Sequence, residues 1–199
     1  MGLFRLFLGI ETNAVTGLKT LGRGMNLEDN HRALEILEAQ KIHTCFNLLI
    51  FDPWCTIDSI RESVDFMGKQ RYFPLNFCRT EVYGGTPLEK SLAKEERLLG
   101  DYHGYTYEIA DARAQRAYEI FRTVFWPRNF AFDGAHFGSM RLDYTFHLLG
   151  NFYADRVTED LETQVKDTLF LLNRHSAELM TDVLDFAASD RFEDDLATE

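Results

Sequence analysis

The order of apolar and amphipathic segments constrains the fold of this 199-residue chain more than any other feature. Three apolar runs are typical of buried strands, and an amphipathic segment typical of a helix follows each of them. The runs are Leu3–Ile10, Thr44–Phe51 and Phe73–Val82. Strands that alternate with helices build a parallel α/β sheet or barrel, so the sequence predicts that class.

The helices that follow the runs begin at recognisable start signals. Asn26 stands before an acidic first turn, and Thr56 opens the next apolar stripe. Thr86 precedes Pro87 and stands three residues before Glu89, which predicts a capping box with proline at the first helical position. These signals set the helix boundaries independently of the apolar pattern.

The second half of the chain has a different pattern. Helical periodicity predicts three helices, over Asp111–Trp126, Phe137–Phe152 and Thr158–Ala187. The expected organisation is therefore an α/β part, a helical extension and an acidic flexible tail, over residues 1–100, 101–188 and 189–199.

Composition excludes several classes of function. The net charge of −11 argues against a general binder of nucleic acid, because such proteins carry basic patches. No apolar run approaches the roughly 20 residues of a membrane span, so no membrane contact is expected. The three cysteines Cys45, Cys55 and Cys78 are far apart, and an odd count favours a reduced, cytoplasmic setting. The six histidines have no paired spacing typical of a metal site.

Two charged residues near the first apolar run are candidate ligand contacts. Glu11 stands at the carboxyl end of that run, where parallel α/β proteins bind ligands, and Arg23 follows it by twelve residues. A carboxylate accepts hydrogen bonds from both hydroxyls of a ribose, and a guanidinium holds a carboxylate in a bidentate fork. The pair suits a small zwitterion attached to a sugar.

At these residues the sequence resembles the radical S-adenosylmethionine enzymes, in particular the branch that often carries an upstream cobalamin-binding domain. The matching segments are Leu8–Thr12, Leu21–Gly24, Asn47–Pro53 with Thr56–Ile60, and Val82–Leu88. They fall within Leu3 to about Leu92, which is nearly half of the chain.

The resemblance implies a fold and a cofactor. The three runs correspond to the fourth, fifth and sixth strands of the family's barrel, which implies a partial (three-strand, half-barrel) parallel TIM-like sheet followed by an all-helical C-terminal extension. Glu11 corresponds to the residue that binds the ribose of S-adenosylmethionine, and Arg23 to the residue that pairs with its methionyl carboxylate. Asn47 corresponds to a polar position that contacts the same cofactor.

The chain departs from the family in one large respect. The family's 4Fe–4S iron–sulfur cluster is held by a CxxxCxxC motif, and this sequence contains none. The cluster is therefore expected only where an N-terminal barrel half supplies the motif. The resemblance makes the chain part of an enzyme, yet the chain alone is expected to be inactive. Cobalamin is compatible with the branch but is indicated by no residue here.

Three alternatives remain open at this point. The chain could be a non-catalytic interaction module that completes a barrel with a separate N-terminal chain, or an inactive truncated product. It could also be an ordinary α/β protein that binds another nucleotide. The absence of GxGxxG and P-loop motifs counts against that last alternative. No catalytic residue and no metal ligand is predicted.

Overall fold

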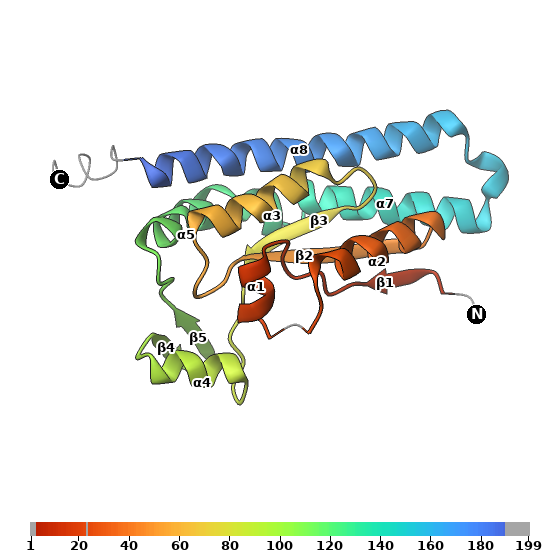
Figure 1. Cartoon of the computed structure of the whole chain (residues 1–199). Coiled ribbons are helices and arrows are strands. Elements are labelled where there is room, and N and C mark those ends of the chain that lie inside the picture. Colours follow the sequence, from red (N-terminus) through yellow and green to blue (C-terminus); the bar gives the residue numbers. More distant parts are fainter. Residues whose placement is uncertain (1–2, 23, 190–199) are drawn as a thin grey trace.

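The computed structural model of the chain describes residues 3–22 and 24–189. Its strands are β1 (Arg5–Phe7), β2 (His43–Phe51), β3 (Leu75–Arg79), β4 (Leu98–Asp101) and β5 (Gly104–Tyr107). Its helices are α1 (Val15–Thr20), α2 (Leu27–Ala39), α3 (Ile57–Lys69), α4 (Pro87–Lys94), α5 (Ala112–Val124), α6 (Trp126–Phe130), α7 (Ala135–Phe152), the 3₁₀ turn η1 (Ala154–Arg156) and α8 (Glu159–Ala188). Figure 1 shows their arrangement.

A parallel sheet with the order β1–β2–β3 confirms the α/β class. β2 follows its predicted run closely, whereas β3 is shorter than expected and β1 has only three residues. The expectation that the first strand is buried on both faces is wrong, because Phe7 is 60% exposed.

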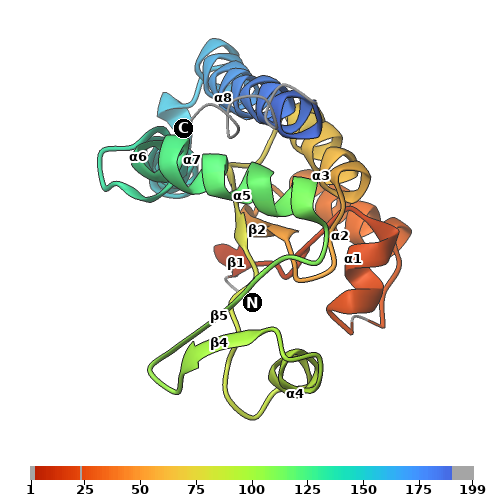
Figure 2. The same ribbon diagram turned by 90° about the vertical axis from the view of Figure 1, so that its left-hand side faces the viewer.

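Helices α3 and α8 form two successive layers over one face of the sheet. α3 packs on β2, and the long helix α8 packs on α3 and also contacts α5 and α7. Figures 1 and 2 show α8 extending along the molecule outside these helices. The core between the layers is fully buried and includes Phe46, Leu48, Ile60, Met180 and Leu184. Burial of this apolar surface is the main stabilising contribution.

The helix start signals are confirmed, with one difference. Asn26 and Thr56 each form a reciprocal capping box at the start of α2 and α3. At α4 the Thr86 side chain accepts a hydrogen bond from the backbone of Glu89, as expected. The Glu89 carboxylate, however, accepts from the backbone N–H of Gly85 at 2.9 Å instead of returning to Thr86.

The antiparallel hairpin β4–β5 was not predicted. It spans residues 100 and 101, where the α/β part was expected to end and the helical extension to begin. Gly100 has a φ of 81°, and a Cβ at this position would lie 2.2 Å from the backbone oxygen of Gly104, so only glycine fits. The hairpin and α4 project from the body of the molecule (Figures 1 and 2). Among the helices of residues 3–22 and 24–189, none has the length and apolar character needed to cross a bilayer.

The two outer edges of the sheet differ. At the β3 edge, the Asn129 side chain donates to the Phe77 backbone oxygen at 3.2 Å, and the His136 ring bonds to the Leu75 backbone. At the β1 edge, the backbone groups of Phe4 and Leu8 form hydrogen bonds with β2. Arg5 and Phe7 alternate with these pairing residues, so their backbone groups point away from β2. No other strand of the described chain pairs there.

Candidate functional site

Glu11 lies at the carboxyl end of the sheet in an uncommon backbone conformation. It forms a parallel bridge to Leu48, and its backbone oxygen accepts a hydrogen bond from Leu49. Its φ of 64° places a non-glycine residue in the left-handed region. Such a conformation costs about 1–3 kcal/mol and is found most often at functional sites. The rest of the fold therefore holds Glu11 in place against a local preference.

Asn47 lies on the face of β2 opposite α3. Side chains alternate along a strand, so Asn47 and Leu49 point away from the face on which Leu48 is buried. Asn47 is half-buried and stands directly beside Asn76 of β3. The register thus gives this face two neighbouring amides, midway along β2 and near the start of β3.

Cys78, near the end of β3, lies within electrostatic reach of Glu11. It lies beside Leu49 in the strand register. Burial, together with the negative charges of Glu81 and Glu11, raises the pKa of the Cys78 thiol to about 12. Both carboxylates therefore lie within electrostatic reach of this thiol. From the sequence, Cys78 contributed only to the spacing and count of the cysteines, and its position two residues after Asn76 on a strand was the available signal.

Arg23 lies outside the described residues. Its pairing with the amino-acid end of a ligand therefore stays a prediction from the sequence. Of the three predicted contacts, the structure describes Glu11, which follows β1, and Asn47, which is midway along β2 and precedes Leu48, the bridge partner of Glu11.

Two other charged residues near this edge have structural roles. The Asp52 carboxylate accepts a hydrogen bond from the Trp54 backbone at 2.8 Å and closes the turn after β2, and burial raises its pKa. The Arg79 guanidinium lies 3.8 Å from the centre of the Tyr107 ring and 4.4 Å from that of Tyr118. It also donates to the Tyr107 backbone oxygen, so Arg79 links the hairpin to α5.

The described residues do not fit an iron–sulfur cluster. Cys45 and Cys55 are buried, and burial raises the pKa of the Cys55 thiol, which opposes thiolate formation. Within the described ranges, no group of three metal-ligand side chains contains a cysteine. The carboxyl-end edge can thus offer hydrogen bonds to a polar ligand but supplies no ligand set for a cluster.

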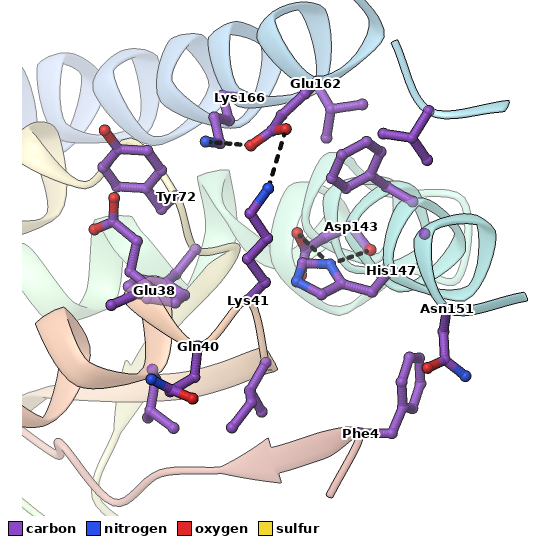
Figure 3. Close-up of a pocket in the computed structure, with 18 of the residues that line it drawn as sticks. Phe4, Glu38, Gln40, Lys41, Tyr72, Asp143, His147, Asn151, Glu162 and Lys166 are labelled. Carbon is purple, nitrogen blue, oxygen red and sulfur yellow. Dashed lines mark hydrogen bonds and ion pairs between the residues drawn. The ribbon is translucent and has the colours of Figure 1, made fainter. Parts of the chain in front are cut away.

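A second feature, a cleft of about 730 Å³, lies at the opposite end of the strands (Figure 3). It is bounded by the end of α2, the start of β2, α7 and the start of α8. The Glu162 carboxylate forms ion pairs with Lys41 at 3.5 Å and with Lys166 at 2.7 Å. The hydrogen bond from Lys166 is the main cause of the lowered pKa of Glu162. Asp143 and His147 line the same cleft.

Comparisons with known proteins give a likeness in structure only. No protein-family model and no curated protein matches the sequence. Solved structures of the cobalamin-dependent S-adenosylmethionine radical enzyme OxsB are similar. The OxsB structure with aqua-cobalamin bound matches this chain with a TM-score of 0.55 at 13% identity. The OxsB structure with aqua-cobalamin and S-adenosylmethionine bound matches it with a TM-score of 0.55 at 15% identity. The apo, selenomethionine-labelled form gives 0.54 at 14%.

The fold of the chain is similar to part of OxsB. Each match covers 98% of this chain and 38% of OxsB, so the chain spans less than half the length of those relatives. The coverage extends beyond the part that resembled the family in sequence and includes the helical region after β5. At this identity the likeness concerns the radical S-adenosylmethionine-related fold and no particular branch.

Proposed function

We propose that the chain forms the part of a radical S-adenosylmethionine enzyme that contacts the sugar and amino-acid ends of the cofactor. The observation that carries the proposal is the left-handed backbone of Glu11 at the carboxyl end of β1, fixed by its bridge to β2. A strained non-glycine residue at the ligand-binding edge of a parallel sheet is a reason to expect a role in binding. The fold shared with OxsB supports the same reading.

Each residue has a distinct role in this proposal. Glu11 accepts hydrogen bonds from the ribose hydroxyls, because an ionised carboxylate has several acceptor sites. Asn47, on the adjacent strand, supplies a neutral polar contact, and Arg23 pairs with the methionyl carboxylate. The three residues bind and orient the cofactor and transfer no proton or electron themselves.

The iron–sulfur cluster and its motif must come from another segment. In such enzymes the bound cluster donates the electron that cleaves the cofactor's sulfonium. A segment with CxxxCxxC, in the same polypeptide or in a separate chain, would extend the sheet at the β1 edge. That edge is available for pairing, whereas side chains of α6 and α7 occupy the β3 edge. Cobalamin would likewise be held outside this chain.

The same edge favours a second candidate function. If the chain only completes a barrel with an N-terminal half, its role is structural and Glu11 contacts no ligand. The two functions differ in one measurable respect, which is whether this chain itself recognises the ribose and amino-acid ends of the cofactor.

A ligand titration followed by NMR tests the proposal. The ¹⁵N-labelled chain is titrated with S-adenosylhomocysteine, which keeps the ribose and amino-acid ends and is chemically stable. We expect saturable shifts at Glu11, Asn47 and Cys78 with a dissociation constant of about 1 mM or tighter, equivalent to roughly 4 kcal/mol. Glu11→Gln should weaken binding at least about tenfold, as loss of a charge-assisted hydrogen bond does.

The matched control is Glu178→Gln on the exposed side of α8, which should bind like the wild type. Absence of shifts in the wild type, or equal binding by the Glu11 and Glu178 variants, would exclude the cofactor role and leave the structural one.

A further inference from the structure

Three side chains from two segments that are distant in sequence meet at the amino end of the sheet. His43 opens β2, and Asp143 and His147 stand one turn apart on α7. The Nδ1 atom of His43 lies 2.6 Å from Oδ2 of Asp143. Nδ1 of His147 lies 3.6 Å from Oδ1 of the same carboxylate. One ligand atom from each residue lies within 4.8 Å of the other two.

The cluster is buried but adjoins the cleft. The side chains of His43 and Asp143 are only 1% and 3% exposed, whereas that of His147 is 18% exposed. Phe4 stacks on the His43 ring, and Tyr144 meets the same ring edge-on at 5.3 Å between centroids. Figure 3 shows Asp143 and His147 on α7 at the wall of the cleft, which gives small ions a route to the cluster.

A buried carboxylate needs a compensating positive charge. The Asp143 carboxylate has lost nearly all contact with solvent, and removal of a charge from water is costly unless a partner of opposite charge is close. The lysines of the cleft, Lys41 and Lys166, are paired with Glu162 instead. The groups that the structure places against this carboxylate are therefore the imidazoles of His43 and His147.

We propose that His43, Asp143 and His147 bind a divalent transition-metal ion of the zinc type, with a fourth coordination position open to the cleft. Two imidazoles and one carboxylate are ligands that such ions prefer, and a divalent ion supplies the charge that the buried Asp143 requires. Helix α7 and strand β2 hold these ligands on rigid elements, which favours a preorganised site. The metal site is at the other end of the strands from Glu11, so it stands independently of the proposed cofactor role.

Binding requires only a small rearrangement. Ligand atoms at about 2.0–2.2 Å from a tetrahedral zinc ion lie roughly 3.3 Å apart. The His147–Asp143 distance already exceeds this value, whereas the His43–Asp143 distance must open from 2.6 Å. In the metal-free state a hydrogen bond between His43 and Asp143 occupies the position that the ion would take. Nδ1 of His147 also donates to the backbone oxygen of Asp143 at 3.1 Å, so the ring must release this hydrogen bond and its proton to bind the ion through Nδ1.

A zinc titration tests the proposal. The chelator-treated chain is titrated with Zn²⁺ by calorimetry, and its melting temperature is measured with and without the ion. We expect one ion per chain and a higher melting temperature in its presence. His147→Gln, at the cleft wall, should weaken zinc binding at least about tenfold and remove the thermal effect. His175→Gln, on the exposed side of α8, is the matched control and should behave like the wild type.

Cobalt substitution gives a readout that does not depend on a variant. Bound Co²⁺ should show visible bands of nitrogen and oxygen coordination without thiolate charge-transfer bands. Three results would each overturn the proposal: no saturable uptake by the wild type, equal zinc affinity of the His147 and His175 variants, or thiolate bands that assign the ion to a cysteine. The first would leave the cluster as a structural ion pair.

Discussion

The phenolic hydroxyl of Tyr107 lies 2.8 Å from the backbone oxygen of Phe51. It also lies 2.9 Å from the backbone oxygen of Thr80, so one buried side chain of β5 reaches the carboxyl ends of both β2 and β3. The hairpin, which otherwise projects from the body, is fastened at the edge where the candidate cofactor contacts lie. Burial raises the pKa of the Tyr107 hydroxyl, so it stays protonated and able to donate.

Removal of this hydroxyl should destabilise the chain. Tyr107→Phe keeps the ring but removes the hydroxyl donor that the backbone oxygens of Phe51 and Thr80 share. The Phe51 oxygen still accepts from the Thr80 N–H, so the main loss is at Thr80, and the free energy of unfolding should fall by about 1–3 kcal/mol. Chemical denaturation measures the difference. Tyr102→Phe, at an 81% exposed site in the same hairpin, is the control and should change stability by less than about 0.5 kcal/mol. Equal effects of the two variants would refute the fastening role.

Glycine at position 11 should separate stability from binding. Glu11→Gly relieves the left-handed backbone, a gain of roughly 1–2 kcal/mol that the extra freedom of the unfolded chain partly offsets. We expect unfolding free energy that is unchanged or slightly raised, together with loss of S-adenosylhomocysteine binding in the NMR titration. Glu96→Gly is a matched control, since Glu96 also has a positive φ, of 57°. It should keep binding intact; a loss of binding by both variants would contradict the assignment of Glu11.

The Cys78 thiol should react slowly in the folded chain. Its pKa of about 12 leaves very little thiolate at pH 8, and the thiolate is the reactive form. Alkylation by iodoacetamide, followed by mass spectrometry of the Cys78 peptide, should be much slower than in the denatured chain. Glu81→Gln removes a negative charge that raises this pKa, so it should speed the reaction, while Glu178→Gln should not. Identical rates in both variants would argue against electrostatic contact between Glu81 and Cys78.

His136 should make the fold sensitive to mild acid. Burial lowers the pKa of its imidazole from 6.5 to about 4. Between these pH values the unfolded chain binds more protons than the folded chain, so His136 stabilises the fold above pH 6.5 and loses that contribution as the pH falls toward 4. His136→Gln should therefore show a shallower fall in unfolding free energy over this range than the wild type. His175→Gln, an exposed control, should retain the full slope, and a parallel slope for all three proteins would disprove the assignment.

Features that depend on local pattern were predictable from the sequence. β2 and α5 match the predicted run and helix within about two residues, because the periodicity of apolar residues reports directly on local structure. The hairpin β4–β5 was missed because its strands have four residues each and its turn carries no common two-residue signal. The left-handed backbone of Glu11 could not be foreseen either, since residues other than glycine disfavour a positive φ.

The histidine cluster illustrates a different limit. His43 and Asp143 are separated by 100 positions, and only the packing of α7 against the start of β2 brings them together. Asp143 and His147 have the spacing of neighbours on one helix face, which was the available local signal. Inspection of the histidines alone therefore missed a group whose third member is an aspartate.

The unequal edges of the sheet bear on how copies of this chain could associate with one another. A strand edge attracts other edges, and a molecule with two such edges can polymerise without limit. Here Asn129 and His136 occupy the β3 side, so self-pairing through β1 would use the same surface on both copies and stop at a closed two-fold pair. The shielding of β3 thereby leaves the three-stranded sheet with one edge, rather than two, for pairing between copies.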